Sequence, residues 1–369
     1  MPPVKVAFPF FGDTVGGSHV SAGLLIRELA NFGIEPFVFS HVAGPLSDFF
    51  EAHGITHSVV NLPFLQSGAK HFEGIISLAK LTPQLRSWLR DEKIALVHTN
   101  DARMAHSWIP ASRAAGIPVI VHQRTAWSPS RLSFVLLRLA NKIIAISTFV
   151  DTTLPPRLKQ TTRTIYDPFA MPCSDRDLAR KNLIKLAGGD GLIAVFVGSL
   201  LNQKRPAVFV SAALLLAERQ RNARFVLIGR ETPLSAQLQA QVADYGSSAN
   251  VIFSGYRSNA QALLAGADVL AAPAINEGFG RTLVEAMQAR VPVVASSSGA
   301  HREIVQHRST GLLVAPNSAP ALADAIDLVF SHPHLASNMA ETAYTWAKDR
   351  FSPREHALQI ASLYRELLA

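Results

Sequence analysis

Short apolar runs alternate with longer stretches of helical periodicity along the first half of the chain. The longer stretches, such as Ser18–Asn31 and His71–Arg90, place apolar residues every three or four positions, as an amphipathic helix does. The apolar runs have the length of β-strands and are Lys5–Phe10, Pro36–Ser40, Ala95–His98, Val119–His122 and Ile143–Ile146. This alternation predicts a parallel sheet covered by helices on both faces.

A second series of strand-like runs follows in the other half of the chain. Its members are Ile193–Val197, Phe225–Ile228, Val251–Phe253, Val269–Ala272, Pro292–Ala295 and Leu312–Val314, with helical segments between them. A chain of 369 residues favours two domains, because single cores stop growing at roughly 250–300 residues. The fold class is therefore α/β, with two doubly wound domains. The prolines within Tyr166–Asp177 indicate the boundary. We expect ligands beyond the carboxyl ends of the strands, in a cleft between the domains.

Composition narrows the class of protein further. Hydrophobic residues make up 48% of the chain and charged residues 17%, which is enough apolar material for two cores. No apolar run of 18 residues marks a membrane span, and the first residues, MPPVKVAFPFFGD, resemble a strand more than a signal peptide, so we expect a cytoplasmic protein. The single cysteine, Cys173, excludes an intramolecular disulfide and argues against a cysteine-built metal site.

The net charge of +8 favours anionic partners such as phosphorylated metabolites, a lipid surface or nucleic acid. The excess is local, because Lys80–Arg163 holds thirteen Lys and Arg against four Asp and Glu. No nucleic-acid-binding motif accompanies the charge, so nucleic acid is not expected as a partner.

A glycine-rich loop, FGDTVGGSHVS, follows the first strand. Gly16 and Gly17 allow close approach of a ligand, and Ser18 is suited to cap the next helix, leaving backbone N–H groups for phosphate or sugar hydroxyls. The loop lacks the G-x-G-x-x-G pattern, which disfavours a dehydrogenase. A plain tight turn before a helix is the structural alternative.

A second loop, AINEGFG, lies between the strand Asp268–Pro273 and a helix. Gly278 and Gly280 let backbone amides converge at the helix N-terminus, which favours an anion, whereas Glu277 at the same place would repel a bare phosphate. A sugar nucleotide resolves the conflict, since its hydroxyls bond to Glu277 and its phosphates to the amides.

Glu285 stands on the following helix, and a carboxylate is the usual partner of the paired ribose hydroxyls. A glycosidase-like pair of carboxylates is the competing chemistry, disfavoured because the glycines indicate phosphate. Two glutamates on a surface helix are the structural alternative.

The run Ala267–Pro316, with its two spaced glutamates, EGFG, the turn at Gly299, EIV and GLLV–P, resembles the donor-binding half of GT-B glycosyltransferases. The resemblance is to the large retaining family 4 type (glycosyl transferases group 1), which includes glycogen and sucrose synthases. More loosely, it covers the whole chain. It implies two Rossmann-like domains: an acceptor-binding domain of residues 1–170 with the C-terminal helix 353–369, and a donor-binding domain of residues 171–352.

The resemblance also implies roles for residues of the second loop. Glu277 would contact hydroxyls of the donor sugar, Gly278, Phe279 and Gly280 would present backbone amides, and Glu285 would bind the nucleotide ribose.

Residues elsewhere acquire roles in the same way. Gly16 and Gly17 would approach the donor phosphates, and His122 would reach the donor sugar, a packed strand-end histidine being the alternative. Lys204 would neutralise the diphosphate. Ser199 stands where the family has an arginine.

Three arginines, Arg205, Arg230 and Arg281, are candidates to replace that missing cation, because positioned charge is a large catalytic term. We predict that Arg281, at the start of the EGFG helix, contributes. Ala300, where the family favours a second glycine, is a milder departure.

The family mechanism implies transfer with retention and without a metal or other cofactor. The acceptor hydroxyl attacks on the side of the departing diphosphate, whose own oxygen takes the proton. The only Asp-x-Asp, Asp175–Asp177, suits a helix start after Ser174 better than a metal site.

The acceptor side is expected to be a glycan or a lipid-linked glycan of the cell envelope, in polysaccharide or lipopolysaccharide synthesis. Arg131–Lys142 and the segment Lys80–Arg90 put apolar residues beside cations, which suits either a peripheral contact with the inner membrane or a core helix with a solvated edge. The rival functions are a GT-B nucleotide-sugar epimerase and a catalytically inactive sugar-nucleotide-binding protein, the latter because of Ser199.

Overall fold

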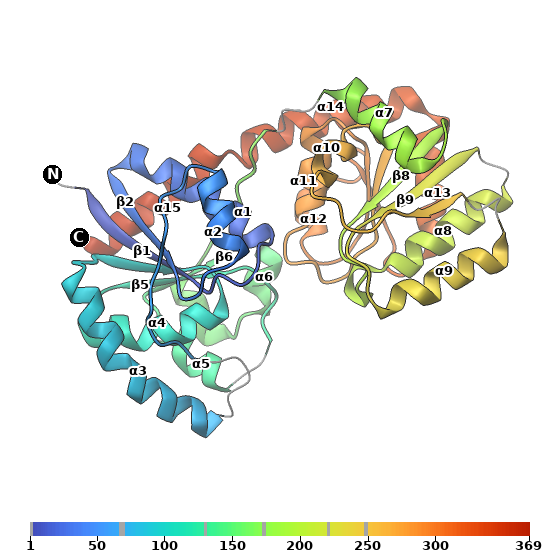
Figure 1. Ribbon diagram of the computed structural model, residues 1–369. Helices are drawn as coiled ribbons and strands as arrows, with labels where there is room; N and C mark the ends of the chain where they lie inside the picture. The colour runs from blue at the N-terminus through green and yellow to red at the C-terminus, as the bar shows by residue number, and fades with distance from the viewer. Residues whose placement is uncertain (1–2, 66–70, 129–130, 172–174, 220–221, 247–249) are drawn as a thin grey trace. The chain divides into compact units, whose positions relative to one another are not determined.

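The computed structural model describes residues 3–65, 71–128, 131–171, 175–219, 222–246 and 250–369. It divides into two compact units (Figure 1). The N-terminal unit comprises Met1–Ala170 and Phe351–Ala369, and the C-terminal unit comprises Met171–Arg350.

The N-terminal unit is built on a parallel sheet with the strand order β3-β2-β1-β4-β5-β6-β7. Its strands are β1 Val4–Phe10, β2 Ile34–Ser40, β3 Ser58–Val59, β4 Leu96–Thr99, β5 Val119–Gln123, β6 Lys142–Ala145 and β7 Thr162–Thr164. Its helices are α1 Gly17–Leu29, α2 Pro45–Ala52, α3 His71–Asp91, α4 Ala102–Ala115, α5 Arg131–Leu137, α6 Thr148–Thr153 and α15 Pro353–Leu368. Two short 3-10 turns, η1 Ala30–Phe32 and η2 Pro156–Thr161, complete it.

Helices cover both faces of this sheet because successive strand residues point in opposite directions. On β1, Phe8 packs with the cluster formed by α1, α2 and α15, whereas its neighbour Ala7 packs with the cluster under α3 and α4. The C-terminal helix α15 lies against α1 (Figure 1). Both faces of the sheet are thus buried, as its apolar runs predict.

The C-terminal unit repeats the plan with the strand order β10-β9-β8-β11-β12-β13. Its strands are β8 Leu192–Val197, β9 Ala223–Ile228, β10 Val251–Phe253, β11 Val269–Ala272, β12 Val293–Ser296 and β13 Leu312–Val314. Its helices are α7 Arg176–Ala187, α8 Pro206–Glu218, α9 Pro233–Tyr245, α10 Ala260–Leu264, α11 Arg281–Gln288, α12 His301–Ile304, α13 Ala319–Ser331 and α14 Pro333–Arg350, with the 3-10 turn η3 Asn202–Lys204.

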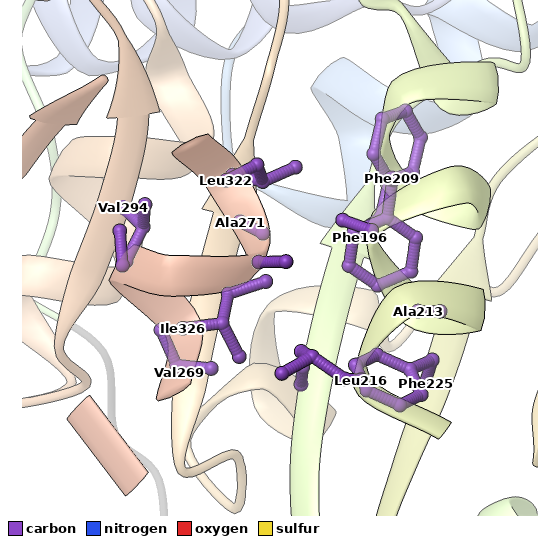
Figure 2. Close-up of a cluster of buried hydrophobic side chains, with 14 of the residues drawn as sticks. Phe196, Phe209, Ala213, Leu216, Phe225, Val269, Ala271, Val294, Leu322 and Ile326 are labelled. Carbon is purple, nitrogen blue, oxygen red and sulfur yellow. The ribbon is translucent and has the colours of Figure 1, made fainter. Parts of the chain in front are cut away.

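Aromatic side chains fill the space between this sheet and α8. Phe196 of β8 lies beside Phe209 of α8, with ring centroids 5.8 Å apart, and Phe225 of β9 completes the group (Figure 2). Each such ring removed from water contributes on the order of 1.5–3 kcal/mol. Ile326 of α13 and Val294 of β12 belong to the same cluster (Figure 2). A packed core therefore holds the ends of the strands in place.

Several local predictions need correction. β3 and β7 were not among the predicted strands; they are edge strands without an apolar run, and their residues are exposed in β3 and half-buried or exposed in β7. α5 ends at Leu137, and the segment to Lys142 turns into β6 instead of continuing as a helix.

The residues that cap α1 and α7 bear on two of the predictions. α1 is capped by Gly16 and not by Ser18. Asp175 caps α7 by accepting hydrogen bonds from the amides of Asp177 and Leu178. Cys173 and Ser174 lie outside the described residues. Over the described part of the chain, the helices are too short or too polar to span a bilayer.

Candidate functional site

The strand order of the C-terminal unit reverses between the neighbouring strands β8 and β11. After β8 the chain therefore continues toward β9 on one side of the sheet, and after β11 it continues toward β12 on the other side. Such a switch point is where doubly wound sheets bind ligands. The two loops are joined by two hydrogen bonds: the amide of Ile275 donates to Gln203 O at 3.0 Å, and the side-chain Nε2 of Gln203 donates to Asn276 O at 3.3 Å. The predicted donor loop therefore lies against the loop that carries Lys204.

Lys204 and Glu277 form an ion pair across this switch point. Lys204 Nζ donates to Glu277 Oε2 at 2.6 Å, and the side chains are 33% and 17% exposed. An ammonium group has three N–H donors, so Lys204 can keep this bond and still donate to a second anion. The pair thus presents a cation and a carboxylate side by side, as a ligand with both phosphate and hydroxyl groups requires.

The backbone of Glu277 is fixed by the loop after β12. The amide of Ala300 donates to Glu277 O at 3.0 Å, and Ser298 Oγ accepts from the amide of Asn276 at 3.0 Å. Gly299 has a φ of +58°, and a Cβ there would lie 2.6 Å from both the N and the O of Glu277. Only glycine satisfies both the conformation and the close approach at this position.

The glycines of the EGFG loop lead into α11. Gly280 caps the helix with a φ of +98°, and Phe279 is buried. His301 lies against Gly280, since a Cβ on that glycine would come within 3.0 Å of His301 Cδ2. Burial lowers the pKa of His301 to about 4, so its ring is uncharged at neutral pH. His301 could not be predicted as part of this site, because its contact with Gly280 arises only in the folded chain.

Arg281 and Glu285 form a second pair on α11. Arg281 Nη2 lies 3.4 Å from Glu285 Oε1, in the i,i+4 relation that favours opposite charges on a helix. Burial raises the pKa of Glu285, and the guanidinium of Arg281 opposes this shift. In this structure Arg281 thus supports the carboxylate predicted to bind ribose, and its role at the diphosphate stays a prediction.

The other candidates for the missing cation occupy different surroundings. Arg205 caps α8 in a left-handed conformation, with a φ of 55°, and its side chain is half-buried. Arg230 is exposed, and its carbonyl accepts from the amide of Leu200 at 3.0 Å. Ser199 is the second residue after β8; it follows Gly198, where an added Cβ would lie 3.8 Å from Lys204 Cδ. Lys204 is therefore the cation that pairs with Glu277, and a role of the three arginines at the diphosphate stays a prediction.

The predicted residues Gly16, Gly17 and His122 belong to the N-terminal unit. Gly16 and Gly17 are exposed at the start of α1, and the amide of Gly16 donates to His19 Nδ1 at 3.0 Å. The amides of Gly17 and Ser18, in the first helical turn, have no carbonyl within the helix to bond. These two amides, rather than that of Gly16, are suited to a ligand.

His122 is 1% exposed and packs among other rings. It stacks between His98 and His356, with centroids 5.4 and 5.9 Å away, and His98 Nε2 lies 3.3 Å from His122 Nδ1. Burial lowers the pKa of His122 well below its usual value. The ring is thus held by packing, while its buried Nε2 has no hydrogen-bond partner among the described residues, so the contact of His122 with the donor sugar stays a prediction.

Arg124 and Asp167 form a buried ion pair beside these rings. Arg124 Nη2 also donates to Asn100 Oδ1 at 3.0 Å. The segment Tyr166–Asp167, close to the boundary between the units, is held further by a hydrogen bond of 2.8 Å between His356 Nδ1 and Tyr166 O. Among the residues that the structure describes, no group of three or more His, Cys, Asp or Glu is arranged to hold a metal ion.

Comparisons with known proteins match both halves of the chain to families of glycosyltransferases. Residues 181–346 match the family model described as "Glycosyl transferases group 1", and residues 15–166 match "Glycosyltransferase Family 4". The lipopolysaccharide core biosynthesis mannosyltransferase LpcC of Rhizobium leguminosarum bv. viciae is 32% identical over 184 residues, or 49% of this chain and 52% of the relative. This match, like those to two other curated relatives, spans about half the length of the relative, between 45% and 52%.

A longer match is to the Escherichia coli UDP-Gal:alpha-D-GlcNAc-diphosphoundecaprenol alpha-1,3-galactosyltransferase, 24% identical over 307 residues and covering 77% of each chain. Among solved structures, HepE of Anabaena in complex with UDP and glucose superimposes with a TM-score of 0.82 at 22% identity, covering 98% of this chain and 100% of HepE. Two Rossmann-like units of parallel sheet and flanking helices are the GT-B architecture. The chain is a member of the group 1, family 4 type of GT-B glycosyltransferases.

Proposed function

We propose that this protein transfers a sugar from a nucleoside diphosphate sugar to a hydroxyl group of an acceptor. The observation that carries the proposal is the Lys204–Glu277 pair at the switch point of the C-terminal sheet, with Glu285 on the adjoining helix. A cation, a hydroxyl-binding carboxylate and a partly buried carboxylate match the diphosphate, the sugar and the ribose of such a donor.

The roles of the residues follow from their charges. Glu277 accepts hydrogen bonds from hydroxyls of the donor sugar, and Glu285 accepts them from the ribose. Lys204 stabilises the negative charge that develops on the leaving diphosphate, and positioned charge of this kind is often the largest catalytic term. Arg281 adds to this charge and keeps Glu285 ionised.

Transfer proceeds with retention of the anomeric configuration and without a metal. The acceptor oxygen attacks the anomeric carbon on the face that the diphosphate leaves, the bond to the diphosphate oxygen breaks, and that oxygen accepts the proton of the hydroxyl. Catalysis then rests on positioning and charge stabilisation, so no protein nucleophile is required.

The acceptor is a glycan or lipid-linked glycan of the cell envelope, made at the inner face of the membrane. Two supports come from the relatives, one of which acts in lipopolysaccharide core biosynthesis and the other on a diphosphoundecaprenol-linked sugar. A third is the basic excess of Lys80–Arg163, which favours an anionic surface.

The test is a transfer assay with the purified protein. UDP-glucose, UDP-galactose and GDP-mannose are each incubated with a panel of acceptors, and the anomeric configuration of any product is read by NMR. We expect release of nucleoside diphosphate together with an α-linked product from an α-linked donor. A β-linked product would contradict retention, and epimerised donor without an acceptor product would favour the epimerase.

A further inference from the structure

A cavity of about 350 Å³ opens in the N-terminal unit, beside the glycine-rich loop. It is lined by residues of the loop after β1, by His19 of α1, and by the cap and first residues of α4, which follows β4. The strand order of this sheet reverses between β1 and β4, so the cavity occupies the switch point of its own sheet. Its volume falls within the range of about 300–1,000 Å³ typical of small-ligand sites.

The cavity carries carboxylates, which accept hydrogen bonds. Asp101 caps α4 by accepting from the amide of Met104 at 2.8 Å, and burial, the larger cause, together with the charge of Asp13, raises its pKa. Asp13 is 46% exposed, and its Oδ2 lies 3.5 Å from Arg103 Nη1. Two acceptor groups from different loops therefore face one small volume.

The same cavity also carries donors and an aromatic surface. The guanidinium of Arg103 lies 4.0 Å from the ring centroid of Phe11, which holds the arginine in place. His19 accepts the amide of Gly16 at Nδ1, so its Nε2 carries the proton and is a donor. Thr14 adds a hydroxyl that serves as either.

The charges in the cavity do not cancel. Arg103 offsets Asp13, burial lowers the pKa of His19 and keeps it neutral near pH 7, and Asp101 adds one negative charge. A phosphate or carboxylate would be repelled, whereas sugar hydroxyls, which both donate and accept, find partners of both kinds.

We infer that this cavity binds an uncharged, hydroxyl-bearing sugar ring of the acceptor, with Asp13, Asp101 and Arg103 as the groups that determine its specificity. The inference rests on the proposed function, and it deepens that function by naming the chemistry of the acceptor. The donor, with its anionic diphosphate, does not suit a cavity of negative charge.

The test measures ligand binding separately from catalysis. Saturation-transfer NMR and titration are carried out with methyl α-glucoside, methyl α-mannoside and methyl α-galactoside, and with the 6-phosphate of each. The proteins are the full chain, Asp13→Asn, Asp101→Asn and the control Asp48→Asn, which changes an exposed aspartate of α2. Asparagine also caps helices well, so Asp101→Asn keeps α4 intact.

We expect the wild type to bind at least one neutral glycoside about tenfold more tightly than its 6-phosphate. Asp13→Asn leaves Arg103 without its partner, so we expect the preference over the phosphate to shrink to about threefold or less, an effect that a merely structural role would not produce. Asp101→Asn should bind the neutral glycoside more weakly than the wild type does, and Asp48→Asn should bind both ligands as the wild type does.

Two results would overturn the inference: no binding of any neutral glycoside to the wild type, or equal preferences in Asp13→Asn and the wild type. Calorimetry with UDP and GDP on the same samples keeps the two claims apart. Nucleotide binding without glycoside binding contradicts the cavity alone, whereas absent nucleotide binding contradicts the proposed function, whatever the glycosides do.

Discussion

Lys204 Nζ and Glu277 Oε2 lie 2.6 Å apart although 73 residues separate them along the chain. They meet because β8 and β11 are neighbours in the sheet and their following loops begin at the same edge. The groups that would hold the diphosphate and the sugar are thus in contact, and each influences the charge that the other presents to a ligand.

Replacing Glu277 with glutamine should separate sugar recognition from nucleotide recognition. The substitution removes the carboxylate that binds sugar hydroxyls, and it also frees Lys204 from its ion pair. We expect the affinity for the sugar nucleotide to fall about tenfold or more, since hydrogen bonds to charged groups contribute roughly 1.5–3 kcal/mol. The affinity for the free nucleoside diphosphate should be unchanged or higher, as measured by calorimetry. Equal losses for both ligands would contradict the assignment.

Gly299→Ala should displace the backbone of Glu277. The added Cβ meets the N and O of Glu277 at 2.6 Å, in addition to the strain of a positive φ. Gly255→Ala is the matched control, because Gly255 has a similar φ of +69° but no atom within 4 Å of the added carbon. We expect the control to lose about 1–2 kcal/mol of stability and to keep donor binding. Gly299→Ala should lose more stability in urea unfolding and also lose donor binding, and wild-type binding by this variant would refute the contact argument.

Arg281→Ala should lower turnover about tenfold or more. Loss of the guanidinium also raises the pKa of Glu285 further, because Arg281 opposes the upward shift that burial causes. The carboxylate would then become protonated at a higher pH as the solution is acidified. Nucleotide affinity measured from pH 8 to 4.5 should therefore begin to fall at a higher pH in the variant. Arg281→Lys, which keeps the positive charge, should retain part of the turnover that Arg281→Ala loses.

The control for Arg281→Ala is Arg219→Ala, which removes a partly exposed arginine paired with Asp324. Turnover of this control should equal that of the wild type. Near-wild-type turnover in Arg281→Ala itself would show that this arginine does not replace the missing cation.

The stability of the protein should fall as the pH decreases from about 6.5 to 4. Burial lowers the pKa of His356 to about 4, so over this range the unfolded chain takes up a proton that the native state excludes. Each such histidine reduces the free energy of unfolding by up to about 1.4 kcal/mol per pH unit. His356→Asn should make the pH dependence of urea unfolding shallower by about one proton, whereas His53→Asn, at an exposed position, should not. Parallel curves for His356→Asn and the wild type would contradict this.

The order of the long elements could be predicted from the sequence because buried parallel strands carry continuous apolar runs, as β1 and β8 do. The edge strands β10 and β13 were predicted because they carry apolar runs, whereas β3 (Ser58–Val59) and β7 (Thr162–Thr164) are too short and too polar to show one. The donor loop could be predicted because its glycines, its glutamates and the helix that follows it lie within one short segment of the sequence.

Contacts between residues that are far apart in the sequence could not be predicted from local sequence patterns. The packing of His122 could not be predicted, because it depends on His356, which α15 supplies from a distant part of the sequence. Asp101 and Arg103 were not singled out, because only the neighbouring of β1 and β4 brings them to the loop that carries Asp13. An aspartate directly after a buried strand was the available signal.

The most direct test of the donor site is calorimetry of UDP and GDP, alone and as sugar nucleotides, with the wild type, Glu285→Ala and the control Glu218→Ala. Glu218 is exposed on α8, whereas Glu285 is partly buried beside the EGFG loop. We expect the wild type and the control to bind one nucleotide tightly and Glu285→Ala to bind it at least tenfold more weakly. No binding of any nucleotide to the wild type, or equal binding by Glu285→Ala, would contradict a donor site in the C-terminal unit.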